Sequence, residues 1–324
     1  MTRRARLGWL AVVVITLAAF VGAAGWLTSP WRPVRSDSAP TEPVVLATGP
    51  KDGLAHRYGL ALAGSPAAPG VVRAVVTAGS QENLDRLSRG QATFALATAD
   101  VVEAYLTTTR PPAIRAVARL YDSYLHLLVP TDSPVHRLAD LAGRRVAVGA
   151  GAELVADRVL AAAGIEPTSQ VTRVVMTPGE AVAELRAGRV DAALLLDGVP
   201  SPDLAPLPGR LVDLADVAGA LLGSSTCPAP DCAVYRAGTV PAASYGGLAV
   251  AITTVAVPTL LLTTAEANAE TVGRFTRLVF DSAPSIAATV PAVRQIDRHT
   301  AIFTGAVPLH EGAKAYYRAT KIAI

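Results

Sequence analysis

Residues 80–100 read SQENLDRLSRGQATFALATAD, and residues 177–198 read TPGEAVAELRAGRVDAALLLDG. In each segment a Ser or Thr that can cap a helix opens a helical stretch, and a glycine, Gly90 or Gly188, ends it. An apolar strand follows after a short connection and stops at Asp100 or Asp197. We interpret the two segments as equivalent elements of two similar lobes. Chance similarity between two Ala/Leu-rich segments is the alternative.

Short apolar strands alternate with helical stretches along the rest of the chain, beginning with Val44–Thr48. This alternation predicts an α/β protein with mostly parallel sheets. The 324 residues, 51% of them hydrophobic and 17% charged, are enough for two domains with large cores. We therefore expect a two-lobe fold.

Turns at the carboxyl ends of the strands are the expected ligand site. In an open α/β sheet, ligands bind beyond these ends, where helix N-termini present free N–H groups. The turns concerned are 48–56, 78–83, 98–100, 149–153 and 197–200. Two lobes whose strand ends face each other would form a ligand cleft between them.

The N-terminus carries an export signal. Arg3, Arg4 and Arg6 precede an uncharged apolar run, Leu7–Leu27, which is long enough for the roughly 20 residues of a spanning helix. The basic start places the chain after Pro30 outside the cytoplasm. We assign residues 1–29 to a signal peptide or transmembrane anchor, with cleavage left open, and the Pro/Ser/Thr-rich residues 30–43 to a linker.

The two cysteines, Cys227 and Cys232, lie in the Pro-rich stretch CPAPDC. In an oxidising compartment such a pair predicts a local disulfide. The alternative, a zinc site, needs further ligands, and no second Cys/His pair stands at suitable spacing. We expect no metal and no cofactor.

Charge and motifs disfavour several functions. The net charge is only +3, with no basic run after the N-terminus, so nucleic-acid binding is not expected. The sequence has no GxSxG elbow, no HExxH pair and no P-loop. We expect no catalytic residues, although a two-lobe fold does not itself exclude an enzyme.

Four motifs give a family resemblance that runs from about Val44 to the C-terminus. Residues 77–84, TAGSQENL, resemble the TGGSxENL turn of the TAXI-type solute-binding proteins of TRAP transporters. Residues 138–149, LADLAGRRVAVG, are similar to a segment shared by many type II periplasmic binding proteins. Residues 197–200, DGVP, fall at the family's GxP turn, and residues 308–317, PLHEGAKAYY, resemble its PLHPGAxxYY ending.

The resemblance implies a type II periplasmic-binding-protein fold. Lobe 1 would comprise residues 44–129 and 254–324, and lobe 2 residues 130–253. Strands near Leu127–Val129 and Val255–Leu262 would be the two crossings between the lobes. The family binds small organic acids or amino acids between two closing lobes and delivers them to a membrane permease. The resemblance thus implies an extracytoplasmic solute-binding protein, anchored to the membrane or secreted. The alternative is an anchored sensor that reports a solute to a histidine kinase or other membrane partner.

Departures from the family pattern put its ligand contacts in doubt. The first turn ends in Leu54, Ala55 and His56, where the family has Thr-Tyr-Tyr. The turn at residues 150–153, AGAE, is about three residues shorter than the family's and lacks its Ser. Several groups that would hold an acid are missing, so the ligand is not expected to be bound by the same contacts.

Most candidate ligand residues lie on the five turns, and Tyr124 lies before the first crossing strand. They are Thr48, Gly49, Lys51, His56, Ser80, Asn83, Thr98, Asp100, Tyr124, Gly151, Ala152, Glu153, Asp197, Gly198 and Val199. Other roles remain open: helix capping for Ser80, Asp100 and Asp197, a solvated loop face for the basic residues, and core packing for Tyr124.

Overall fold

The computed structural model describes residues 43–67, 69–108, 113–222 and 234–323. The proposed signal peptide or anchor, residues 30–42 of the linker, and both Cys227 and Cys232 lie outside these residues. Within the described residues, no helix is long and apolar enough to span a bilayer.

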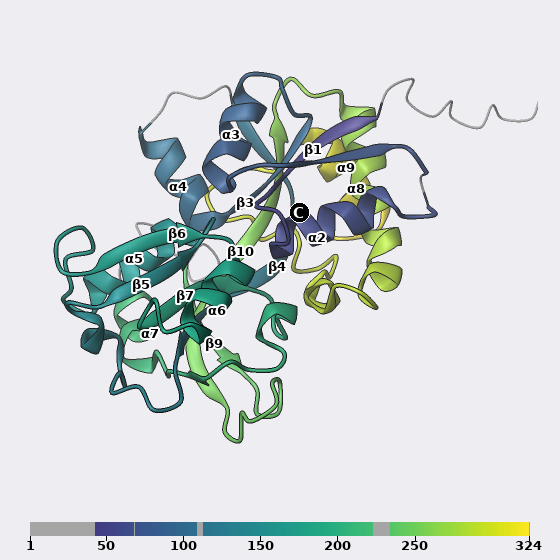
Figure 1. Cartoon of the computed structure of the whole chain (residues 1–324). Helices are drawn as coiled ribbons and strands as arrows, with labels where there is room; N and C mark the ends of the chain where they lie inside the picture. Colours follow the sequence, from purple (N-terminus) through teal and green to yellow (C-terminus); the bar gives the residue numbers. More distant parts are fainter. Residues whose placement is uncertain (1–42, 68, 109–112, 223–233, 324) are drawn as a thin grey trace, which may run out of the picture. The chain divides into compact units, whose positions relative to one another are not determined.

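The described strands form one mixed sheet, with β8 and β9 off its main path (Figure 1). Along that path the order is β2-β1-β3-β10-β4-β7-β5-β6. The strands are β1 (Val44–Gly49), β2 (Val72–Val76), β3 (Phe94–Thr98), β4 (Ile114–Val129), β5 (Arg145–Gly149), β6 (Thr172–Met176), β7 (Ala192–Asp197), β8 (Arg210–Leu211), β9 (Arg236–Val240) and β10 (Ile252–Thr264).

Helices connect and cover these strands. The α-helices are α2 (Leu54–Ala63), α3 (Ser80–Ser88), α4 (Ala99–Thr108), α5 (Glu153–Ala162), α6 (Pro178–Arg186), α7 (Ala215–Leu222), α8 (Ala269–Ile286) and α9 (Glu311–Ala319). Short 3₁₀ helices are η1 (Leu138–Leu141), η2 (Pro202–Leu204) and η4 (Pro291–Gln295).

The same arrangement occurs twice in the sheet. β1 pairs in parallel with β2 and β3, and β5 pairs in parallel with β6 and β7. In both sets the chain order is strand, helix, strand, helix, strand, with the first strand in the middle. We call β1–β3 with α2–α4 the first half, and β5–β7 with α5, α6 and the segments that pack on them, residues 215–221 and 234–251, the second half. The predicted equivalence of the two repeated segments is confirmed.

Two long antiparallel strands stand between the halves. β4 pairs with β10 over residues 114–124 and with β7 over residues 124–128. β10 pairs with β3 through residues 259–262 and with β9 through residues 252–256. These are the two crossing strands expected near Leu127–Val129 and Val255–Leu262. The described residues from 43 onward form one compact unit, so the lobe boundaries at 129/130 and 253/254 stay a prediction.

Side-chain alternation along the strands produces four core clusters. Phe94 and Leu96 of β3 pack toward α2, α8 and α9, whereas Ala95 and Ala97 pack toward α3 and α4. In the second half, one cluster includes α5 and α7 and the other α6. Because helices cover both faces, the inner parallel strands β1, β3 and β7 are mostly buried along their length, as is usual for parallel sheets. The fold is α/β, as predicted.

One cap differs from the prediction. Thr177 caps α6 in a capping box with Glu180, as expected, but the N-cap of α3 is Gly79 and not Ser80. Gly79 has φ 141°, a conformation that favours glycine. Ser80 is the first helical residue, and its Oγ accepts a hydrogen bond from the Thr98 amide at 3.1 Å.

Candidate functional site

Three of the predicted turns meet between the two halves. A Cβ on Gly79 would lie 3.2 Å from the Cα of Gly151, and a Cβ on Gly151 would lie 3.8 Å from the Pro50 side chain. The β2–α3 turn therefore contacts the β5–α5 turn, which also lies beside the β1–α2 turn. Both glycines have positive φ, so this close approach depends on residues without a side chain.

A cleft of about 340 Å³ lies beside this contact; we call it the outer cleft. Its size falls within the range of small-molecule pockets. The α3 and α4 side contributes Ala78, Gly79, Ser80, Gln81, Glu82, Val101 and Ala104, and the β5–α5 side contributes Gly151, Glu153 and Leu154. Both halves therefore form its walls.

Carboxylates are the only charged side chains among the outer-cleft residues. Glu82 Oε2 accepts a hydrogen bond from the Ala78 amide, and its Oε1 accepts one from Arg86 Nε, each at 2.7 Å. Both hydrogen bonds lower the pKa of Glu82, and the bond from the Ala78 amide has the larger effect. Glu153 Oε2 accepts from the Gly151 amide at 2.7 Å. A carboxylate ligand would have to rely on backbone N–H groups and on the neutral side chains of Ser80 and Gln81, because no lining side chain is basic.

The predicted basic residues lie outside the outer cleft. His56 is buried in α2, and its Nδ1 lies 2.9 Å from Thr48 Oγ1. Burial lowers the pKa of His56, and Asp52 opposes this effect. Lys51 is exposed in the β1–α2 turn.

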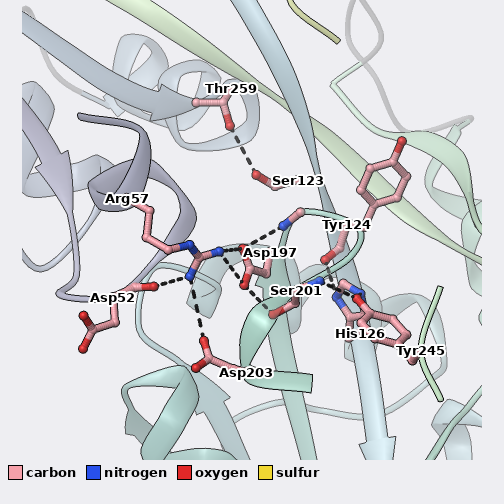
Figure 2. Close-up of polar contacts among 11 residues, drawn as sticks. Asp52, Arg57, Ser123, Tyr124, His126, Asp197, Ser201, Asp203, Tyr245 and Thr259 are labelled. Atoms are coloured by element: carbon pink, nitrogen blue, oxygen red, sulfur yellow. Dashed lines mark hydrogen bonds and ion pairs between the residues drawn. The ribbon is translucent and has the colours of Figure 1, made fainter. Parts of the chain in front are cut away.

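A buried ion pair joins the halves on the side of α2. Arg57 Nη2 lies 2.7 Å from Asp197 Oδ1 and 3.0 Å from Oδ2 (Figure 2). Asp197 also accepts from the Gly198 amide at 2.7 Å and from Ser201 Oγ at 2.6 Å. The side chains of Arg57 and Asp197 are 22% and 2% exposed, so the pair is largely withdrawn from water.

Hydrogen bonds continue from this pair into the second half. The Ser201 amide donates to Tyr245 Oη at 2.9 Å, and Tyr245 Oη lies 2.9 Å from His126 Nε2 (Figure 2). His126 Nδ1 lies 2.9 Å from the Tyr124 carbonyl, which can only accept. Nδ1 therefore carries a proton. Burial is the main influence on the pKa of His126 and lowers it, although Asp197 opposes this effect. The lowered pKa favours the neutral ring.

Several buried polar atoms near this pair make no hydrogen bond among the described residues. They are the hydroxyls of Tyr58 and Tyr121 and Asp203 Oδ2, which lies 3.9 Å from Arg57 Nη1 as a longer ion pair. Burial raises the pKa of Tyr121 well above its usual value; Arg57 lowers it and Asp197 raises it. Unsatisfied buried groups of this kind call for a water or ligand partner.

Asp203 provides a pH test of this environment. Burial raises its pKa, Asp197 adds to the rise and Arg57 opposes it. A carboxyl whose folded pKa exceeds its unfolded pKa makes the protein less stable as pH rises through this interval. Asp203→Asn, which cannot ionise, is therefore expected to raise Tm modestly at pH 7 but not near pH 4. Thermal unfolding at both pH values checks this; an equal gain at both, or none at pH 7, contradicts it.

A second contact between the halves lies on the side of α4. Asp100 Oδ2 accepts a hydrogen bond from the Tyr235 hydroxyl at 2.9 Å. Arg158 of α5 lies 3.6 Å from Glu103 and stacks over the Tyr235 ring, 5.5 Å from its centroid. Asp100 is 1% exposed, and its side chain joins the halves in this structure.

Other predicted residues have internal partners. Asn83 is fully buried and donates to the carbonyls of Thr48 at 2.8 Å and Leu96 at 2.6 Å. It links the ends of β1 and β3 and has no amide proton left for a ligand. Thr98 binds Ser80, and Thr48 Oγ1 donates to the Val75 carbonyl at 2.7 Å.

Of the remaining predicted residues, Ala152 and Gly49 lie at the turns that meet, whereas Gly198, Val199 and Tyr124 lie away from them. Ala152 is 1% exposed beside Gly151, and Gly49 ends β1. Gly198 lies against Leu54 and Ala292, and Val199 packs on the α6 core. The ring of Tyr124 points away from the Arg57–Asp197 pair (Figure 2).

The candidate list omitted several residues that join the halves. Arg57 directly follows His56, and the sequence identifies it only as a basic residue near the first turn. Tyr235 and Tyr245 come from segments without a motif, and only the fold brings them to Asp100 and His126. Among the described residues, no group of three or more His, Cys, Asp or Glu side chains could hold a metal ion.

This architecture defines the chain as a periplasmic-binding-protein-like α/β protein. The chain belongs to the NMT1-like family, whose model matches residues 46–319.

Solved structures are similar to this chain at low sequence identity. A protein described as a periplasmic transporter is 16% identical, with 88% of this chain and 94% of that chain covered and a TM-score of 0.50. The aliphatic sulphonate-binding protein SsuA of Escherichia coli is 18% identical, with coverage of 86% and 83% and a TM-score of 0.42. The alkanesulfonate-binding SsuA of Xanthomonas axonopodis pv. citri, bound to MOPS, is 18% identical, with coverage of 79% and 81% and a TM-score of 0.43.

Proposed function

We propose that this protein is an extracytoplasmic solute-binding protein, and that its two halves act as lobes that close on a small molecule. The observation that carries the proposal is the outer cleft, whose walls come from both halves at the carboxyl ends of β2, β3 and β5. A solute in this position would contact both halves at once. Binding would therefore favour the closed arrangement over any more open one.

The proposed binding residues are those at the cleft surface. Ser80 and the first N–H groups of α3 lie on one wall, and Gly151 and Glu153 lie on the other. Asn83, Thr48 and Asp100 support the site from behind through the hydrogen bonds described above. We assign no reaction to this constellation.

Of the expected ligands, an amino acid fits the outer cleft better than a simple acid. Helix N-termini favour a carboxylate. Glu82 and Glu153 add negative charge to the lining, and a ligand ammonium group would complement this charge. A plain dicarboxylate would bring two negative groups to a lining without a basic side chain.

We propose further that the protein belongs to the TAXI type and works with a TRAP-type membrane permease, with its N-terminal segment as export signal or anchor. The TGGSxENL-like turn supports this assignment because it forms the α3 wall of the outer cleft.

A binding screen with a cleft-filling variant tests the proposal. The full chain is heated with each of a set of amino acids and small carboxylates. A ligand at a hundredfold excess over Kd should stabilise by ~2.7 kcal/mol and raise Tm by a few degrees. Ala104→Trp, which fills the cleft from α4, should abolish the shift.

Leu60→Trp, at a position 54% exposed on α2, is the matched control and should keep the shift. The proposal fails if no solute stabilises the folded wild-type chain, or if Ala104→Trp responds as Leu60→Trp does.

A further inference from the structure

Two arginines share one carboxylate where β9, β10 and β4 lie side by side. Arg119 Nη2 lies 2.6 Å from Asp122 Oδ1, and Arg236 Nη2 contacts Asp122 Oδ2. Arg236 of β9 is opposite Ala256 of β10, which is opposite Tyr124 of β4. Residues directly opposite in antiparallel strands point to the same face, so Arg236 and Tyr124 share a face of the sheet.

The cluster carries more positive than negative charge. Two guanidinium groups face a single carboxylate, and among the described residues neither arginine forms another ion pair. The side chains of Asp122 and Arg119 are 13% and 14% exposed, so water screens this imbalance poorly. Burial lowers the pKa of Arg119, and Arg236 lowers it further against the opposing effect of Asp122.

Hydrogen-bonding capacity is also left over. Arg236 Nε is buried without an acceptor in the described part of the chain. Each oxygen of Asp122 already accepts from one arginine, and the Asp122 amide donates to Gln295 Oε1 at 2.9 Å. A further acceptor for Arg236 would have to come from outside this cluster.

Neutral polar groups surround the arginines. Burial raises the pKa of the Tyr124 phenol, and the charge of the nearby Asp122 raises it further. Arg236, Arg119 and a hydrogen bond with Gln295 lower this pKa. All these groups therefore lie around the Tyr124 phenol. The ring rests on Gly238, where a Cβ would lie 2.8 Å from a ring carbon. The Arg236 side chain is 41% exposed and can be reached from solvent.

We propose that this cluster, Arg119, Asp122, Arg236 and Tyr124, binds a small oxyanion, either a carboxylate or a sulfate-like group. Arg236 is its main ligand because its side chain is the more exposed of the two arginines, at 41% against 14% for Arg119. The planar guanidinium fork matches two oxygens of one anion. The site is separate from the outer cleft, with which it shares no residue, and does not depend on a solute bound there.

Calorimetric titration of the full chain with sulfate and with acetate, against chloride at equal ionic strength, tests the proposal. We expect saturable binding of at least one oxyanion. Arg236→Gln should weaken it at least about tenfold, because one charged hydrogen-bond donor is lost. Arg189→Gln, which removes the same charge from a site where Arg189 is 61% exposed, should bind as the wild type does.

Two further variants keep the test decisive if Arg236→Gln does not fold. Tyr124→Phe keeps the ring on Gly238 and should weaken binding less than the arginine change. Arg236→Lys keeps the charge without the planar fork and should bind weakly but measurably. The absence of saturable oxyanion binding to the wild type overturns the proposal. Equal losses in the Arg189 and Arg236 variants, with Tyr124→Phe unaffected, also overturn it.

Discussion

Arg57→Met is expected to lower the free energy of unfolding by about 3 kcal/mol, because it leaves Asp197 buried without its counter-charge. Asp197 is 2% exposed, and Arg57 supplies its only ion pair within the described residues. Methionine keeps much of the apolar stem, so the effect reports mainly the loss of charge. The remaining partners, the Gly198 amide and Ser201 Oγ, are neutral. Chemical denaturation measures the change.

A second substitution separates charge burial from lost packing. Arg57→Met combined with Asp197→Asn removes the buried charge and should recover a substantial part of the stability lost by Arg57→Met alone. Arg189→Met, which breaks the exposed Arg189–Glu184 pair, should change stability little. If Arg57→Met costs no more than Arg189→Met, the ion pair does not hold the halves together.

Gly312→Ala is expected to destabilise the protein by about 3 kcal/mol or more, since overpacking against backbone cannot be relieved by a side-chain movement. A Cβ at residue 312 would lie 2.1 Å from the carbonyl oxygen of Ala269 and 3.0 Å from the amide nitrogen of Gly273. The methyl group would force α9 away from α8. Contacts between them, such as Phe280 stacked on Tyr316 with ring centroids 5.5 Å apart, would be disturbed.

Gly219→Ala is the matched control for this prediction. Gly219 lies in α7, is exposed, and has nothing within 4 Å of an added Cβ. Alanine has the higher helix propensity, so this change should leave stability equal or raise it by up to about 1 kcal/mol. Equal behaviour of the two variants in thermal unfolding would contradict the close α8–α9 packing.

The fold could be predicted because its signals are local. Helices that end at a glycine and run into apolar strands, as at Gly90 and Gly188, specify the element order directly. Buried strands stop at polar turns, so the polar residues in the sequence predict where each strand ends. The crossing strands were also expected, although β4 is far longer than the predicted segment at residues 127–129.

The candidate site could be predicted only in part. The turns that meet, at residues 49–50, 79 and 151, were expected from the strand-end rule. The roles of individual side chains depend on partners that are distant in sequence. Asp197 binds an arginine 140 positions away, and Asp100 binds a tyrosine 135 positions away. No local pattern contains such pairings, so a polar residue at a strand end could equally be a ligand contact, a cap or a link between halves.

Hydrogen–deuterium exchange of the full chain, with and without a solute found in the binding screen, tests the central claim most directly. If the solute binds between the halves, amides at residues 78–82 and at residues 151–154 should both exchange more slowly in its presence, because these segments form opposite walls of the outer cleft. Protection confined to one half, or found only at distant segments, would contradict binding between the halves.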